Sequence, residues 1–341
     1  METSHGPRPV VILGPTAGGK SELAVALAEY GVTLDGRPGE VISADSMQVY
    51  RHMDAGTAKP EPTLRRRAAH HMIDCVEPTQ RFTVHDWLQR TNRLIEQLRA
   101  AGKRPIIVGG TNLYLKALLE GLFDGPPADP ALRDRLAAMS TEALHAELAE
   151  VDPTAADRIH RNDRKRLTRA LEVYHHTGAP ISSFQQQWER SPETGPAEAS
   201  TAAIAPGRYH HDPILIGLAW PTMLINRRIN RRVREMFHPE TGTWPGEPLP
   251  EETARLEAAG LLGPQAREAL GYKQVLAALA GHGTMAEAEE QTRIHTRRFA
   301  KQQRTWLKRF GGVRWIEADK GDADHHFTSA KEAIEAAVEA E

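Results

Sequence analysis

The sequence predicts an α/β fold built around a parallel β-sheet. Two short apolar runs, at 10–13 and 106–108, each end directly in glycine, as buried strands do when they lead into tight turns. Segments with a helical spacing of apolar residues, such as 85–101, separate runs of this kind. Strands that alternate with helices are typical of a parallel sheet with crossover connections, which we therefore expect in the first part of the chain.

The elements of this first part follow from local patterns. Helix 21–30 carries its apolar residues on one face, and helix 85–101 does the same before Gly102 stops it. The short run 40–44 is a strand candidate that ends at Asp45. In chain order we expect strand 10–13, helix 21–30, strand 40–44, helix 85–101, strand 104–108 and helix 112–119.

From residue 129 onward the composition changes. Residues 132–151 are rich in Ala, Leu and Glu and predict a helix, and 164–176 predicts a basic amphipathic helix ended by Gly178. Proline and glycine in 189–213 predict a loop or hinge. The later elements expected are strand 213–219, helix 225–237, an irregular insertion at 238–250, helices 265–280 and 285–309, and a surface helix of little consequence past residue 321.

These elements divide the chain into four parts. We expect an α/β core at 1–124, a helical insertion domain at 125–210, completion of the core with basic C-terminal helices at 211–320, and a surface tail at 321–341.

Composition excludes several classes of protein. The 341 residues include 43 Lys and Arg against 45 Asp and Glu, a net charge of −2 that excludes a uniformly basic nucleic-acid binder but not local basic patches. The single cysteine, Cys75, excludes an intramolecular disulfide and a zinc site made of cysteines. No apolar run approaches the roughly 20 residues that span a bilayer, and residues 1–9 lack the apolar core of a signal peptide. We expect a soluble cytoplasmic protein with no membrane partner.

A phosphate-binding loop is the strongest motif. Residues 14–21, with the sequence GPTAGGKS, match G-x-x-x-x-G-K-[ST] between an expected strand and an expected helix. In such a P-loop (Gly14, Pro15, Thr16, Ala17, Gly18, Gly19, Lys20 and Ser21) backbone N–H groups surround phosphate oxygens. Lys20 supplies a positive charge and the Ser21 hydroxyl is placed to ligate Mg²⁺. We therefore expect a P-loop NTPase-like core that binds a di- or triphosphate.

Two further polar residues end strands at the same edge of the sheet. Asp45 follows strand 40–44 and Thr111 follows strand 104–108, where open α/β sheets hold their active sites. Asp45 could ligate Mg²⁺ through water or take a proton from a nucleophile, but it could equally cap a turn. Thr111 could be an active-site hydroxyl or the cap of helix 112–119.

Basic side chains gather in three helical segments. Any one of them is most simply a solvated helix face, but three in a chain of net charge −2 favour contact with an RNA backbone. The three groups are Arg161, Arg164, Lys165, Arg166 and Arg169; Arg227, Arg228, Arg231, Arg232 and Arg234; and Arg293, Arg297, Arg298, Lys301, Arg304, Lys308 and Arg309.

Eight segments together resemble the bacterial tRNA isopentenyltransferase (tRNA dimethylallyltransferase) family. The resemblance covers nearly the whole chain, from about residue 10 to residue 315. The segments are 14–21, 45–51, 56–60, 70–74, 108–116, 162–174, 271–273 and 296–306.

The resemblance implies a reaction. Members of this family transfer a dimethylallyl group from dimethylallyl pyrophosphate to N6 of the adenosine immediately 3′ of the anticodon, in tRNAs that read codons beginning with U. The P-loop would then hold the pyrophosphate of the donor, with Mg²⁺ and Lys20 stabilising the leaving group. Asp45 would be the general base toward the amine, and Thr111 would hydrogen-bond near the reacting groups.

The resemblance also implies binding residues. Arg228 and Arg232 would reach the pyrophosphate, and a flipped adenine would contact the segment after strand 40–44. The implied tRNA-binding residues are Asp45, Ser46, Met47, Gln48, Thr111, Arg133, Lys165, Arg166, Arg169, Gly271, Tyr272, Lys273, Arg297, Arg298 and Lys301. The anticodon stem-loop would pass between the core and the helical insertion, and we expect a monomer.

Several alternatives stay open. A prenyltransferase acting on free AMP or ADP would have no use for the basic segments. A small-molecule kinase would share only the P-loop. A non-catalytic RNA-binding protein would not need Lys20, Ser21, Asp45 and Thr111. The Pro-rich stretches 189–213 and 238–250 are longer than the family pattern suggests. His70, His71 and Cys75 are most simply packing or hydrogen-bonding residues.

Overall fold

The computed structural model describes residues 6–34, 38–123, 125–126, 129–184, 209–242 and 246–338. The chain forms two compact units. Unit 1 comprises Met1–Leu119 and Ala199–Glu341, and unit 2 comprises Glu120–Glu198.

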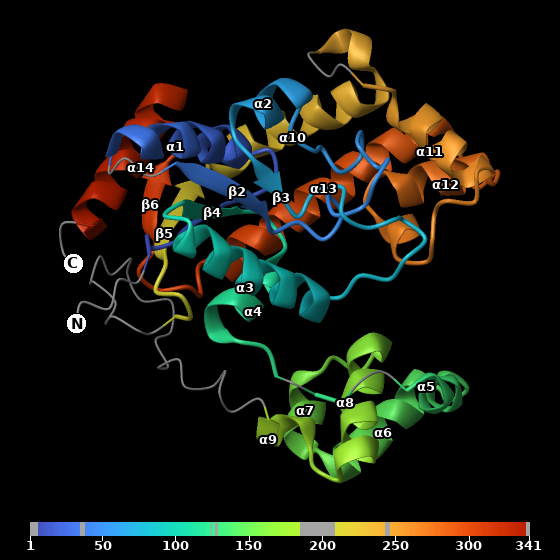
Figure 1. The fold of residues 1–341 in the computed structure, drawn as a ribbon. Coiled ribbons are helices and arrows are strands. Elements are labelled where there is room, and N and C mark those ends of the chain that lie inside the picture. Colours follow the sequence, from blue (N-terminus) through green and yellow to red (C-terminus); the bar gives the residue numbers. More distant parts are fainter. Residues whose placement is uncertain are drawn as a thin grey trace, which may run out of the picture. The chain divides into compact units, whose positions relative to one another are not determined.

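Unit 1 is an α/β domain around one parallel sheet of six strands (Figure 1). The strand order is β3-β2-β4-β1-β5-β6, which places the first strand in the centre. The strands are β1 (Val10–Leu13), β2 (Gly39–Ser43), β3 (His70–His71), β4 (Arg104–Val108), β5 (Ile214–Ala219) and β6 (Arg314–Glu317). This confirms the predicted fold class, because every pairing in the sheet is parallel.

Helices cover both faces of the sheet (Figure 1). Alternate strand residues point to opposite faces, so Val11 and Ile107 pack in one apolar core while Val10 and Ile106 pack in the other. The second core is closed by α1 (Lys20–Leu34) and α14 (Ala323–Val338). The first core lies against α3 (Val84–Ala100), α4 (Asn112–Glu120), α10 (Thr222–Phe237), α11 (Leu249–Ala258), α12 (Tyr272–Leu279) and α13 (Met285–Leu307).

Unit 2 is helical and has its own core of Leu and Ala side chains. Asp129, Ser140, Asp152 and Asp163 cap its successive helices with their side-chain oxygens, which explains why the chain starts a new helix at each of these points. The helices are α5 (Pro130–Ala137), α6 (Thr141–Val151), α7 (Pro153–Arg158), α8 (Arg164–Thr177) and α9 (Ile181–Phe184).

The structure corrects several predicted elements. The expected helix 132–151 is two helices, because Ser140 caps a new one, and the expected helix 265–280 is a 3-10 turn (Ala266–Glu268) followed by α12. Within the expected irregular stretch 238–250, residues 239–241 form a 3-10 turn and α11 begins at Leu249. The helix past residue 321 was expected to be of little consequence, but α14 contributes to the second core, where Ala330 and Ile334 are buried.

Some elements of unit 1 in the described part of the chain were not among the expected ones, including the short strand β3. Strand β6 has only Ile316 buried, so it shows no apolar run, and α2 (Pro62–Arg67) has no buried residue. Helix α11 begins within a Pro-rich stretch that was expected to be irregular. Of the predicted hinge 189–213, residues 189–208 lie outside the described part of the chain. No helix in the described ranges has both the length and the apolarity needed to cross a bilayer.

Candidate active site at the phosphate-binding loop

The P-loop, residues 14–21, joins the central strand β1 to α1. Its backbone turns through left-handed conformations at Ala17 and Gly19, where φ is 59° and 84°. Gly18 allows close packing, because a Cβ atom there would lie 2.8 Å from the Pro15 carbonyl oxygen. Helix α1 begins at Lys20, so the N–H groups of its first turn have no acceptor within the helix and are available to an anion.

Side chains from the far end of the chain hold this loop in place. The Trp220 Nε1–H donates to the Gly18 carbonyl at 3.0 Å, and the Arg228 Nε–H donates to the Ala17 carbonyl at 2.7 Å. The Arg228 guanidinium also lies 4.7 Å from the Trp220 ring centre. Gln303 accepts from the Thr16 N–H at 2.9 Å. The loop is therefore fixed from outside before any ligand binds.

Trp220 and Gln303 contact the P-loop but were not among the predicted site residues. Trp220 comes directly after strand β5, at the edge where the other strands carry their site residues. Asp45 and Thr111 were predicted as site residues because each follows the carboxyl end of a strand, and the same reasoning applies to Trp220. Gln303 follows no strand, because it lies within α13, but it belongs to segment 296–306, one of the segments on which the family resemblance rests.

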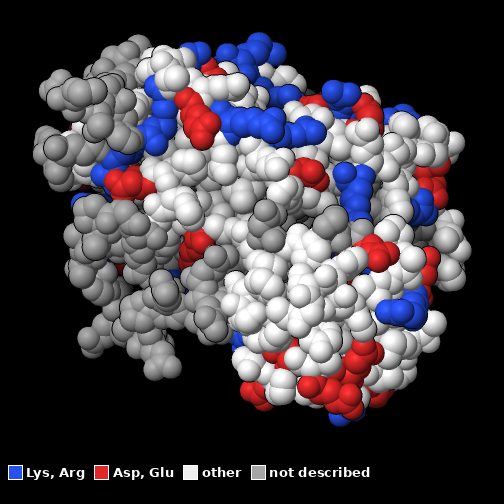
Figure 2. All heavy atoms as spheres, turned by 60° about the horizontal axis from the view of Figure 1, so that its bottom comes forward, with Lys and Arg blue, Asp and Glu red and all other residues white. Residues whose placement is uncertain are grey.

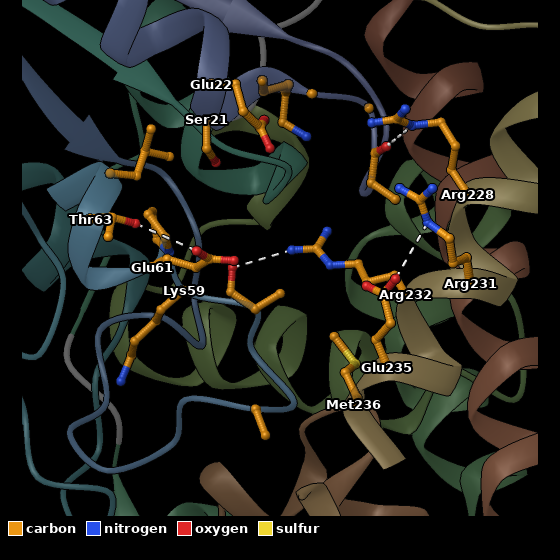
Figure 3. A pocket seen from close by; sticks show the side chains of 18 of the residues that line it. Ser21, Glu22, Lys59, Glu61, Thr63, Arg228, Arg231, Arg232, Glu235 and Met236 are labelled. Carbon is orange, nitrogen blue, oxygen red and sulfur yellow. Dashed lines mark hydrogen bonds and ion pairs between the residues drawn. The ribbon is translucent and has the colours of Figure 1, made fainter. Parts of the chain in front are cut away.

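A cavity of about 410 Å³ opens beside the P-loop. Its walls come from residues 17–22, the segment 55–61, α2 and α10 (Figure 3). Lys20, Ser21, Arg228 and Arg232 all line it, so the structure brings together the P-loop and the two arginines that the sequence analysis linked to pyrophosphate.

Three of the basic side chains that line this cavity have lowered pKa values. Burial lowers the pKa of Lys20 to about 8, and the charge of Arg232 adds to this effect, whereas Asp45 and Glu22 oppose it. Burial likewise lowers the pKa of both Arg228 and Arg232. In the described part of the chain, none of the three forms an ion pair with a carboxylate, whereas Arg231 beside them is 3.5 Å from Glu235. Partly buried positive charge without a carboxylate partner is the environment that binds a polyanion.

Asp45 and Thr111 lie together at the carboxyl ends of β2 and β4. The Asp45 Oδ1 atom accepts from the N–H groups of Met47 and Gln48, at 2.9 and 3.3 Å. Thr111 Oγ1 accepts from the Ser46 N–H at 3.0 Å. Asp45 thus caps the turn 45–48, one of the three roles considered for it, and its charge partly opposes the lowering of the Lys20 and Arg232 pKa values by burial.

The amide of Gln48 is already bonded to the protein. Its Nε2 donates to the carbonyls of Thr57 and Ala58 at 3.3 and 3.2 Å, and its Oε1 accepts from the Ser43 hydroxyl at 2.9 Å. Contact between Gln48 and an adenine stays a prediction.

Tyr272 does not fit its expected role in this conformation. It is completely buried, and its hydroxyl donates to Glu252 at 2.5 Å and accepts from the Gly56 N–H at 3.3 Å. A side chain enclosed in this way supports the segment 53–60 and cannot touch an RNA without being uncovered. Its neighbour Gly271 adopts a φ of 91° at the start of α12, and Lys273 is exposed beside Glu268 at 2.7 Å.

In unit 2 the predicted RNA-binding arginines have partners of their own. Arg133 makes two hydrogen bonds to Glu172, at 2.8 and 2.9 Å, and Arg169 makes one at 2.6 Å. Glu172 is fully buried, and hydrogen bonds from both arginines lower its pKa despite the opposing effect of burial. Lys165 is exposed, and Arg166 is exposed beside Asp163 at 3.4 Å.

On α13, exposure separates the predicted RNA-binding residues. Arg298 and Lys301 are exposed, whereas Arg297 is half-buried between Asn230 and Glu290. Figure 2 shows that on one face of the molecule basic and acidic side chains form separate small clusters rather than one continuous basic field. This agrees with a net charge of −2.

The weaker candidates have simple structural roles. The His71 Nε2–H donates to the Glu40 carboxylate at 2.6 Å, and the His70 Nδ1–H donates to the Ala68 carbonyl at 2.8 Å. Burial raises the pKa of the Cys75 thiol, which makes it less reactive.

The residues at the P-loop fit a magnesium ion held mainly by phosphate. The described residues contain no group of three or more His, Cys, Asp or Glu side chains that could form a complete protein site. Mg²⁺ usually keeps several waters and takes one or two protein oxygens together with phosphate oxygens. The Ser21 hydroxyl, which lines the cavity, is such an oxygen.

Comparison with known proteins gives a consistent result. The family model described as IPP transferase matches residues 48–310. A tRNA dimethylallyltransferase of Geobacter sulfurreducens is 42% identical over 313 residues, which is 90% of this chain and 91% of that protein.

Solved structures agree with the sequence comparison. The tRNA isopentenylpyrophosphate transferase of Bacillus halodurans superposes with a TM-score of 0.64 at 34% identity, covering 98% of this chain and 99% of that one. A eukaryotic dimethylallyltransferase described as acting on tRNA gives a TM-score of 0.72 at 25% identity, covering 96% of this chain and 77% of that one.

Proposed function

Because this chain belongs to the IPP transferase family, we propose that it is a tRNA dimethylallyltransferase. It transfers a dimethylallyl group from dimethylallyl pyrophosphate to tRNA and releases pyrophosphate. The acceptor is N6 of the adenosine 3′-adjacent to the anticodon, in tRNAs that read codons beginning with U. The protein acts as a monomer in the cytoplasm, where its tRNA substrate is made.

One observation carries the proposal. Lys20, Arg228 and Arg232 face one cavity beside the P-loop, and Asp45 is close enough to influence the pKa of two of them. A pyrophosphate leaving group and a general base are the two things that this transfer needs side by side.

The charges then act on the leaving group. As the C1–O bond of the donor breaks, negative charge grows on the pyrophosphate, and Lys20, Arg228, Arg232 and the first N–H groups of α1 stabilise it. Mg²⁺ bound at Ser21 would add further positive charge there. The fixed position of the P-loop means that little reorganisation is needed during the reaction.

Asp45 acts on the incoming amine. As the new bond forms between C1 and N6, the amine loses a proton, which Asp45 accepts. The hydrogen bonds from the Met47 and Gln48 N–H groups hold the carboxylate in position for this step. Thr111 accepts from the Ser46 N–H at 3.0 Å and donates its hydroxyl hydrogen to the Ser46 hydroxyl at 3.4 Å, a long hydrogen bond that it would exchange for one to the substrate.

The decisive experiment uses labelled donor. Purified protein with Mg²⁺ and radiolabelled dimethylallyl pyrophosphate is incubated with unmodified tRNA and, separately, with AMP, and Lys20→Met serves as the inactive control. Label in tRNA at the adenosine beside the anticodon supports the proposal. Label only in AMP would move the protein to the class that acts on free nucleotides, and no label in either would contradict a prenyl transfer.

A further inference from the structure

Lys59 lies in the wall of the donor cavity but is not directed at the ligand space. Its side chain is 4% exposed, and Figure 3 shows it extending away from Arg228 and Arg232. The ammonium group donates to the Tyr50 carbonyl at 2.6 Å, to Asp54 at 2.7 Å and to Asp74 at 2.6 Å. An ammonium has three N–H donors, so all of them are used within the protein.

The neighbouring residue, Ala58, links the two halves of the proposed active site. Its carbonyl accepts from Arg232 Nη2 and from Gln48 Nε2, each at 3.2 Å. Ala58 has a φ of 48°, a left-handed conformation that is unfavourable for a residue with a side chain. Such a conformation persists only where the surrounding contacts hold it.

Contacts from α11 and α12 complete the restraint. The buried carboxylate of Glu252 accepts from the N–H groups of Asp54 and Ala55 at 3.1 Å. Tyr272 holds both Glu252 and the Gly56 N–H through its hydroxyl. Segment 53–60 is thus held by the hydrogen bonds of its own Lys59 and by Glu252 of α11 and Tyr272 of α12.

We propose that Lys59 is a positioning residue for pyrophosphate binding, which acts by fixing the Ala58 carbonyl that orients Arg232. The inference deepens the proposed function and rests on it, because Arg232 is the residue through which Lys59 would act. It predicts that the contributions of Lys59 and Arg232 to pyrophosphate affinity are coupled rather than independent.

A double-mutant cycle tests this coupling. The affinity for inorganic pyrophosphate in the presence of Mg²⁺ is measured by calorimetry for the wild type, Lys59→Met, Arg232→Ala and the double variant. We expect Lys59→Met to weaken binding about tenfold, within the range of coupling for residues in one network. In the Arg232→Ala background the same change should have little further effect. Losses that multiply would show that Lys59 acts independently of Arg232 and would overturn the proposal.

Two further variants keep the test decisive. Tyr272→Phe removes the hydroxyl of α12 that contacts the same segment at Gly56. It should show a smaller coupling to Arg232, and it tests the restraint of the segment if Lys59→Met does not fold. Lys103→Met removes a lysine that pairs with Glu40 elsewhere in unit 1, and should leave pyrophosphate affinity unchanged. A wild type that binds no pyrophosphate would overturn the proposed function and this inference together. Binding without coupling would overturn the inference alone.

Discussion

Gln303 accepts a hydrogen bond from the backbone N–H of Thr16 at 2.9 Å, although 287 positions separate the two residues in the chain. Its amide nitrogen donates to the Gly110 carbonyl at 2.7 Å. One buried side chain of α13 therefore joins the loop after β1 to the loop after β4. The P-loop and the segment that carries Thr111 are held at a fixed separation by this amide.

Replacing Gln303 should disturb the P-loop directly. Gln303→Leu leaves the Thr16 N–H without its acceptor, which should cost about 1–3 kcal/mol of stability and lower kcat/KM for the donor roughly tenfold. Gly110→Ala should have a similar kinetic effect, because a Cβ atom there would lie 2.1 Å from the Gln303 amide nitrogen. Steady-state kinetics and thermal unfolding measure both effects. Gln302→Leu, at the exposed neighbouring position, is the matched control and should change neither.

Asp45→Asn separates the two roles of this residue. The amide keeps an oxygen that can accept from the Met47 and Gln48 N–H groups, so the turn should survive, but it cannot take a proton. We expect kcat to fall by about 10²–10⁴ while tRNA affinity, measured by filter binding, changes less than about twofold. Asp45→Ala should additionally weaken tRNA binding, because the turn loses its acceptor. Equal turnover by wild type and Asp45→Asn would remove Asp45 from proton transfer.

The lowered pKa of Lys20 gives binding and stability opposite pH dependences. Lys20 is positively charged below its pKa of about 8, so pyrophosphate affinity should decrease as the pH rises through this value. Stability should instead increase between about pH 8 and the ordinary lysine pKa of 10.5, because the unfolded chain binds more protons there than the folded one. Calorimetric titrations and denaturant unfolding across this range measure the two trends. In Lys20→Arg the guanidinium stays charged, and neither trend should remain.

Exposed basic residues of α13 should determine part of the salt dependence of tRNA binding. In the described part of the chain, neither Arg298 nor Lys301 has a carboxylate partner, so both can replace counterions on a phosphate backbone. Replacing both with Gln should weaken binding and reduce the slope of log K against log salt by about 1–2. Arg293→Gln is the matched control, since Arg293 already pairs with Glu289 and Glu290, and it should leave the slope nearly unchanged. An unaltered slope in the Arg298 and Lys301 variant would place this face of the helix outside the RNA contact.

Local patterns were enough to predict the edge of the sheet that carries the site. The P-loop, Asp45 and Thr111 each follow a short apolar run, and a strand followed by a polar turn is a property of neighbouring residues. The same reasoning failed for β6, where three of four side chains are exposed and the strand depends on pairing with β5. Periodicity alone could not divide 132–151 into two helices.

The contacts between residues far apart in the sequence could not be predicted. Tyr272 belongs to a recognisable motif, but only the fold shows that its hydroxyl is enclosed between Glu252 and Gly56. The three partners of Lys59 come from two separate turns that meet in space. The role of such a residue is decided by tertiary packing, which composition and spacing do not encode.

The arrangement of the P-loop has a consequence for how the protein is made. During translation the P-loop leaves the ribosome early, whereas Trp220, Arg228 and Gln303 emerge about two hundred or more residues later. Strand β1 also lies between β4 and β5 in the sheet, so its pairing is complete only after β5 has been synthesised. A nascent chain therefore carries an unfinished anion site until α13 has been synthesised, and an active enzyme exists only once that helix has docked.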